Sequence, residues 1–151
     1  MAVSVRRFSL LGLLTGSLVL GCSNATPTSP VANDVAAARV LWQRAALTRY
    51  AFTSTLSCFC APDYSAAMRV VVLNGLVSSI TAAATGVSVP VTYRQPIDSI
   101  FVNLARQAAE NPSMLTVQFD ATLGYPVYAE FRSLAADAGY TVNISNLQPL
   151  P

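Results

Sequence analysis

The residues best suited to chemistry in this chain are two cysteines, Cys58 and Cys60, which stand on either side of Phe59. In a regular strand, residues two apart have Cα atoms about 6.6 Å apart, near the upper limit for a disulfide, so a bond between them requires a bend or a bulge. Four interpretations are open: a local structural disulfide, two packed thiols, a redox-active pair, and thiolate binding of Cu(I), which suits two soft ligands. A structural zinc site needs four ligands, and the chain has no histidine to complete one.

Two missing residue types restrict the chemistry further, because the chain contains neither histidine nor lysine. It therefore lacks the usual general base near neutral pH, a histidine-activated nucleophile, a Schiff-base lysine and a phosphate-loop lysine. Five carboxylates show no acid/base spacing and are expected on the solvated surface: Asp98, Glu110, Asp120, Glu130 and Asp137. We therefore expect a protein that is not an enzyme and that has no catalytic residues, metal site or cofactor.

The third cysteine, Cys22, follows an apolar segment near the N-terminus. Arg6 and Arg7 precede a stretch of thirteen mostly apolar residues, 8–20, which is the layout of an export signal and is short for a membrane span of about 20 residues. The ending Val19-Leu20-Gly21-Cys22 resembles the bacterial lipoprotein box, although Leu20 is unusual at its position. We expect residues 1–21 to be a lipoprotein signal peptide and Cys22 to be lipidated; the alternative is an ordinary secretory signal with a coincidental cysteine.

Residues 22–33 are rich in Ser, Thr, Pro and Asn and are expected to form a flexible tether. Two or more acyl chains on Cys22 would anchor the protein stably without a spanning helix. Ser23 after the cysteine resembles a sorting pattern for the outer membrane. The expected location is the bacterial cell envelope, lipid-anchored and facing the periplasm. Beyond Arg7, seven arginines balance seven acidic residues, so nucleic acid is not an expected partner.

The remaining chain, 34–147, is predicted to be a single α+β domain, followed by a tail at 148–151. Apolar residues recur at helical spacing from Val35 to about Tyr50, with Asn33 or Asp34 as the cap. Alternation from Tyr50 to Cys58 predicts a strand, and Asn74-Gly75 between two apolar runs predicts a hairpin.

The second half repeats this order. Pro96 suits the first position of a helix whose apolar stripe runs to Ala108, and Asn111-Pro112 ends it. Three alternating strands follow, over 115–119, 127–131 and 140–144. We expect two helices packed on one face of an antiparallel sheet, and the repeated order suggests two helix-plus-three-strand repeats.

A loop between two of these strands contains Gly124, Tyr125 and Pro126. The plain interpretation is a wide hairpin loop in which Gly124 adopts a positive φ and Pro126 begins a strand. The alternative is a binding loop that presents Tyr125.

The order of several short segments resembles a small bacterial lipoprotein family, domain of unknown function number 6174. The segments are Leu41-Trp42, Leu47 with Tyr50 and Phe52, Cys58-Phe59-Cys60, RVVVLNG at 69–75, Ile97-Asp98 with Ile100-Phe101, Val117 with Phe119-Asp120, Gly124-Tyr125-Pro126, and DAGYTVNISNL at 137–147. The chain departs from the family pattern at Ala61 and at Glu130-Phe131-Arg132. The resemblance implies a fold and a location but no activity.

From these observations we expect a non-catalytic binding or scaffolding module whose partner is a protein of the cell envelope. The rival hypothesis is a thiol-redox or Cu(I)-handling protein that acts through Cys58 and Cys60.

Overall fold

The computed structural model describes residues 28–135 and 138–151. The predicted signal peptide at 1–21, the lipidation site Cys22 and the tether as far as residue 27 lie outside the described residues, as does Asp137.

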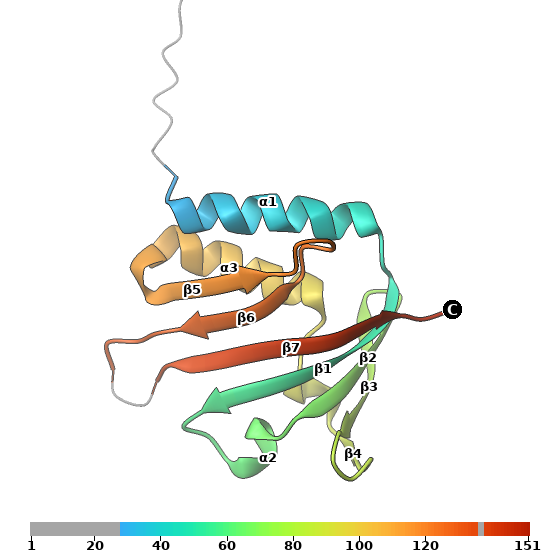
Figure 1. The fold of residues 1–151 in the computed structure, drawn as a ribbon. Helices are drawn as coiled ribbons and strands as arrows, with labels where there is room; N and C mark the ends of the chain where they lie inside the picture. Colours follow the sequence, from blue (N-terminus) through green and yellow to red (C-terminus); the bar gives the residue numbers. More distant parts are fainter. Residues whose placement is uncertain (1–27, 136–137) are drawn as a thin grey trace, which may run out of the picture.

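The described residues form one antiparallel sheet with helices beside it (Figure 1). The helices are α1 (Pro30–Ala45), α2 (Pro62–Ser65) and α3 (Ile97–Glu110), with 3-10 turns η1 (Val91–Tyr93) and η2 (Pro112–Met114). The strands are β1 (Arg49–Cys58), β2 (Met68–Leu73), β3 (Leu76–Ala82), β4 (Ser88–Val89), β5 (Leu115–Phe119), β6 (Pro126–Phe131) and β7 (Tyr140–Pro149). Their order across the sheet is β4-β3-β2-β1-β7-β6-β5. The predicted α+β class is confirmed.

Helix α1 begins earlier than its apolar spacing predicts. Ser29 is the N-cap, and its hydroxyl accepts a hydrogen bond from the backbone N–H of Ala32. Pro30 occupies the first helical turn, where its missing N–H costs nothing. The predicted caps Asn33 and Asp34 are therefore wrong, and the helix ends at Ala45, before a left-handed Ala46, rather than near Tyr50.

The hairpin follows the predicted pattern, but the last strand, β7, continues beyond the predicted 144 to Pro149, because its end pairs with the start of β1, so the predicted tail at 148–151 is partly strand. Asn74 and Gly75, with φ of 54° and 76°, join β2 to β3, so the hairpin prediction is confirmed. Pro126 begins β6 as expected. Pro96, in contrast, is the N-cap of α3 rather than its first residue.

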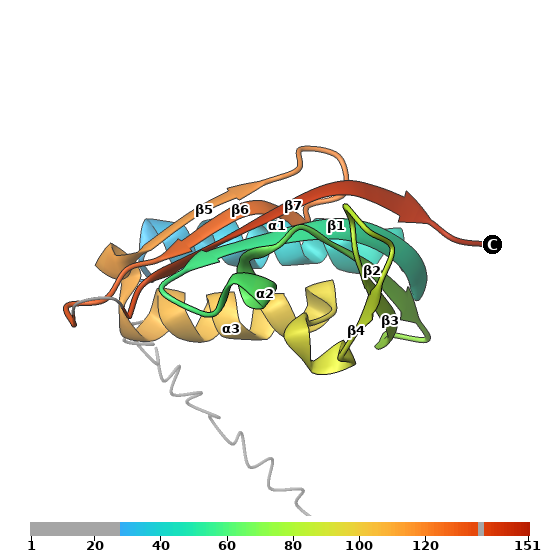
Figure 2. The same cartoon turned by 90° about the horizontal axis from the view of Figure 1, so that it is seen from below.

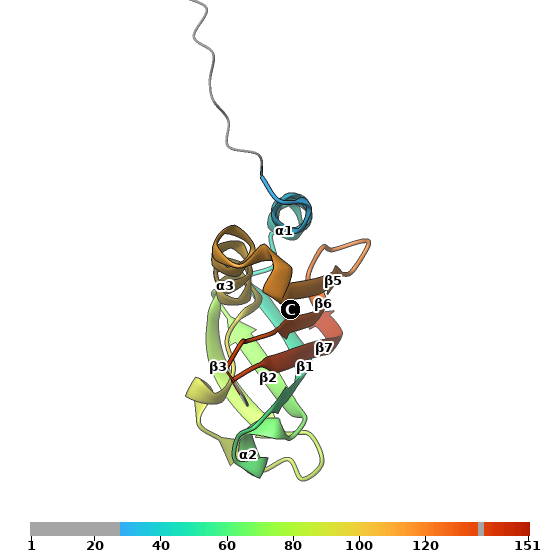
Figure 3. The same cartoon turned by 90° about the vertical axis from the view of Figure 1, so that its left-hand side faces the viewer.

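The sheet has one apolar and one polar face, which is the alternation that the sequence predicts. Cross-strand pairs such as Tyr50 with Val72 and Phe52 with Val70 place the apolar side chains on the face that meets α1 and α3. Viewed along the strands, α3 lies against this face and α1 lies beside α3 (Figure 3). The opposite face carries residues such as Thr55 and Asn143, which are paired across β1 and β7.

The predicted helix count and repeat are not confirmed. Within the described residues there are three α-helices, because a single turn, α2, interrupts the connection from β1 to β2. The strand order is also unequal in the two halves: β1 lies in the middle of the sheet, whereas β5, the first strand of the second half, lies at its edge. Similar local patterns therefore occupy different positions in the sheet.

Candidate functional site

The two cysteines of the C-x-C segment lie at the end of the central strand β1. Cys58 is the last residue of the strand, and the chain bends at Phe59 and Cys60. The bend reduces the distance between the two cysteine Cα atoms to 5.3 Å, and the cysteines form a disulfide. Of the four interpretations open at the level of sequence, this geometry matches the local disulfide.

The disulfide holds Phe59 between its two half-cystines and leaves the ring in solvent. Phe59 is 82% exposed, and Leu134, after the end of β6, is 91% exposed. Both side chains line an open groove of about 670 Å³. A single exposed apolar side chain is ordinary on a protein surface, but two such side chains beside one groove make the groove a candidate contact surface. We call this surface the Phe59 groove; its other lining residues include Glu130, Arg132 and Thr141.

The floor of the Phe59 groove is formed by paired strands. Phe131 of β6 and Tyr140 of β7 are paired across the two strands, and their rings stack with centroids 4.5 Å apart. Cys58 is in turn paired with Tyr140 across β1 and β7. Three hydrogen-bonded strands therefore form the floor, and Phe59 and Leu134 lie just beyond the ends of β1 and β6.

The loop with Gly124, Tyr125 and Pro126 packs against α1 instead of projecting into solvent. Gly124 has a φ of 77°, and a Cβ placed there would collide with the carbonyl oxygen of Ala38. Gly124 and Pro126 are buried, and Tyr125 is half-buried against the core. This contact accounts for the glycine without a ligand, and a binding role for the loop stays a prediction.

Four of the five scattered carboxylates have structural partners, of which Glu130 accepts a hydrogen bond from the Tyr128 hydroxyl at 3.5 Å. Asp98 accepts a hydrogen bond from the indole Nε1–H of Trp42 at 3.2 Å. Asp120 accepts hydrogen bonds from the backbone N–H groups of Thr122 and Leu123, which closes the loop between β5 and β6.

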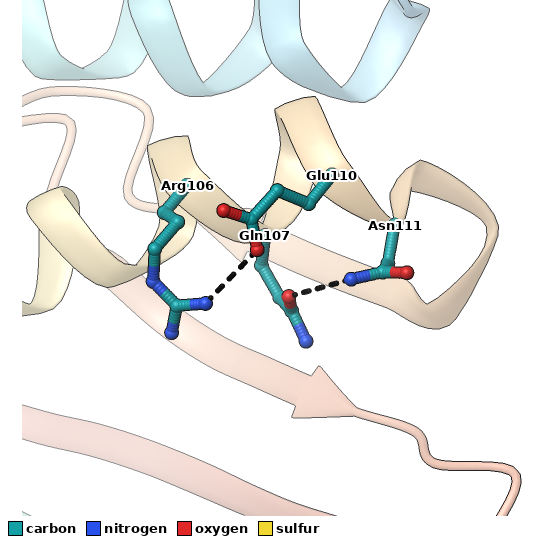
Figure 4. A network of polar contacts seen from close by, with 4 residues as sticks. All are labelled: Arg106, Gln107, Glu110 and Asn111. Atoms are coloured by element: carbon teal, nitrogen blue, oxygen red, sulfur yellow. Dashed lines mark hydrogen bonds and ion pairs between the residues drawn. The ribbon is translucent and has the colours of Figure 1, made fainter.

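Glu110 pairs with Arg106 at 3.1 Å along the last turns of α3, next to a hydrogen bond from Asn111 to Gln107 (Figure 4). The Arg106 and Glu110 side chains are more than half exposed. An exposed ion pair of this kind stabilises a helix by only about 0.3–0.5 kcal/mol. The pair lies on the helix surface, apart from the other carboxylates, and therefore does not form an acid/base site.

Sequence reasoning missed two features. No sequence pattern around Leu134 predicts that its side chain is exposed, since an apolar residue between strands is expected to be buried. Arg94 was also missed: it is 8% exposed and lines a second hollow beneath α3. A lone arginine before a helix is expected at the surface, so only the packing reveals its burial.

Neither a metal-binding cluster nor a membrane-spanning helix occurs in the described ranges. No group of three or more His, Cys, Asp or Glu residues there could hold a metal ion. None of the helices there is both long enough and apolar enough to cross a membrane.

The fold and this surface define the class of protein: a small α+β domain in which a disulfide at the end of the central strand presents an exposed phenylalanine beside an open groove. The chain belongs to the family of unknown function DUF6174, whose model matches residues 34–149. The resemblance of the short segments to this domain of unknown function is thereby confirmed. No curated protein and no solved structure matches the chain significantly.

Proposed function

We propose that this protein is a lipid-anchored, non-catalytic binding module of the bacterial cell envelope, attached through Cys22 and facing the periplasm. The anchor rests on the segment Leu20-Gly21-Cys22 after a charged start and an apolar stretch. The binding role rests on the Phe59 groove, where two side chains more than four-fifths exposed flank one hollow.

The start of α1 limits how far the domain could lie from its anchor. Six residues lie between Cys22 and the Ser29 cap, in place of the longer tether that the sequence predicts. The seven Cα-to-Cα steps from Cys22 to Ser29 span at most about 25 Å when fully extended. The first turn of α1 and the last residues of β1 and β6 lie at one end of the molecule, and the C-terminus lies at the other (Figures 1 and 2). An anchored chain would therefore present the Phe59 groove close to the membrane, where an envelope protein could meet it.

The disulfide supports a binding role because it constrains the backbone at Phe59 before any partner arrives. Ordering the backbone of one residue costs roughly 1–2 kcal/mol. A residue between two bonded cysteines avoids part of this backbone cost on binding. Aromatic side chains are also enriched among the residues that dominate protein interfaces.

The anchor is tested by labelled palmitate in growing cells. The wild type should incorporate the label, and Cys22→Ser should not, while Cys60→Ser serves as the matched control and should be labelled as strongly as the wild type. Label that persists in Cys22→Ser, or that is missing from the wild type, contradicts the anchor.

The Phe59 groove is tested by site-specific photocrosslinking in intact cells. A photoreactive residue at position 59 should give a discrete crosslinked product that is lost in Leu134→Ser. The control position is Leu76, which is 72% exposed at the start of β3, beside the hairpin at the opposite end of β1 from Cys58. An identical product from both positions, or a product at position 59 that is unaffected by Leu134→Ser, contradicts a specific site.

The rival function is thiol exchange or Cu(I) handling. It requires that a reductant can reach the same disulfide. Cys60 is exposed and Cys58 is half-buried, so a dithiol reductant could reach the bond. Two-electron reduction with uptake of two protons would yield two thiols, and their thiolates suit Cu(I). Mass spectrometry with and without reductant and Cu(I) separates the two functions: a stable disulfide that takes up no copper favours the binding module.

A further inference from the structure

A cavity of about 180 Å³ lies between α3 and the apolar face of the sheet. Leu56, Ile100 and Val142 supply apolar walls from β1, α3 and β7. Arg94, Asn103 and Tyr140 supply polar groups to the same space. The cavity thus combines a hydrocarbon-lined body with a cationic and hydrogen-bonding part, which is the usual composition of a small-molecule site.

Arg94 is the unusual member of this lining because its charge is buried and, in the part of the chain that the structure describes, has no counter-charge. Its side chain donates three hydrogen bonds, to the carbonyl oxygens of Tyr64 at 2.7 Å, Tyr93 at 2.8 Å and Ala66 at 3.0 Å. All three acceptors are neutral. The buried Nε–H has no partner, and within the described residues no carboxylate forms an ion pair with Arg94.

The carbonyl contacts explain the position of the Arg94 side chain but not its charge. They tie the end of α2 to η1, where Tyr64 and Tyr93 also stack with centroids 4.2 Å apart. A buried charge without an opposite charge is costly, and burial accordingly lowers the pKa of Arg94. A ligand that brings a negative charge to this place would remove that cost.

We propose that this cavity binds a small organic monocarboxylate, with its carboxylate on the Arg94 guanidinium and its apolar part against Leu56, Ile100 and Val142. Carboxylates accept hydrogen bonds from guanidinium in a charge-assisted geometry. The volume fits one ring, since a cavity of about 150 Å³ lined by apolar side chains accommodates benzene. This site is distinct from the Phe59 groove, although Phe131 and Tyr140 line both, and it does not depend on the lipid anchor or on a protein partner.

Benzoate and benzamide, which have nearly the same shape but differ in charge, test the proposal by ligand-observed NMR and calorimetry. Benzoate should bind saturably at one site, at least tenfold more tightly than benzamide. The discrimination should disappear in Arg94→Gln and should be retained in Arg69→Gln, since Arg69 lies exposed on β2.

Because Arg94→Gln also removes contacts to α2, a second variant keeps the test decisive if that protein fails to fold. Ile100→Phe adds volume to the cavity wall and leaves Arg94 unchanged, so a folded Ile100→Phe protein should lose benzoate binding. Equal affinity for benzoate and benzamide, no saturable binding of benzoate, or binding that survives in Ile100→Phe would each overturn the carboxylate site.

Discussion

The hydroxyl of Tyr50 on β1 accepts a hydrogen bond from the backbone N–H of Ile97, the first residue of α3, at 3.0 Å. The first N–H groups of a helix have no partner within the helix, and the N-cap here, Pro96, provides no side-chain acceptor. Tyr50 is fully buried, and its ring meets that of Trp42 on α1 edge to face at 5.2 Å. One side chain of the central strand therefore positions both long helices.

Removing this hydroxyl should destabilise the protein. Tyr50→Phe keeps the ring but leaves the Ile97 N–H buried without an acceptor, which costs about 1–3 kcal/mol. Urea unfolding followed by the fluorescence of Trp42, the single tryptophan, measures the change. Tyr128→Phe, on the open face of the sheet, is the matched control and should stay within about 0.5 kcal/mol of the wild type. A Tyr50→Phe protein as stable as the wild type contradicts the capping role.

The same residue should make stability fall at high pH. Burial raises the pKa of Tyr50 to about 12 in the folded protein, from 10.0. Its contribution is fully present below pH 10 and is lost as the pH rises through 12, because only the unfolded chain releases the proton in that interval. A rise from 10 to about 12 corresponds to a loss of roughly 3 kcal/mol. Urea midpoints at pH 9 and pH 11.5 test this, and the fall should be clearly smaller in Tyr50→Phe.

Gly124 should tolerate alanine far less well than Gly75 does. Both have a positive φ, 77° and 76°, so each alanine carries a left-handed strain of roughly 1–2 kcal/mol. Nothing lies within 4 Å of a Cβ at Gly75, whereas one at Gly124 would meet the Ala38 carbonyl and lie 2.8 Å from the Cβ of Leu41. Gly124→Ala should therefore lower the free energy of unfolding by about 1–3 kcal/mol more than Gly75→Ala does. Thermal unfolding of the two variants measures this difference. Equal losses of stability would mean that the loop does not pack tightly on α1.

The disulfide should be present but weakly stabilising. In a Cys22→Ser background, the only thiols that remain are those of Cys58 and Cys60. Protein isolated without reductant and then unfolded should show no reactive thiol, and two after reduction. Closing a loop of three residues is worth roughly 1.6 kcal/mol, so replacing both cysteines by alanine should lower the unfolding free energy by about that amount. Two reactive thiols before reduction would contradict the disulfide.

Much of this architecture could be predicted from local patterns. Asn74-Gly75 specifies its hairpin because two successive left-handed residues suit a tight turn between strands. The alternation through Leu115, Val117 and Phe119 likewise predicts a strand with one buried face, and the structure agrees. The caps were less predictable, since Ser29, Asn33 and Asp34 are all good N-cap residues and only the packing selects Ser29.

The sequence alone determined the family, the α+β class, the proximity of Cys58 to Cys60 and the scarcity of catalytic groups, because these depend on residue types and on near neighbours. Only the tertiary structure decided that β1 lies at the centre of the sheet, that Gly124 packs on α1, and that Phe59 and Leu134 share a groove. The burial of Arg94 was also decided only by the tertiary structure. Each of these depends on contacts between residues far apart in the chain, and local periodicity carries no information about which distant segments meet.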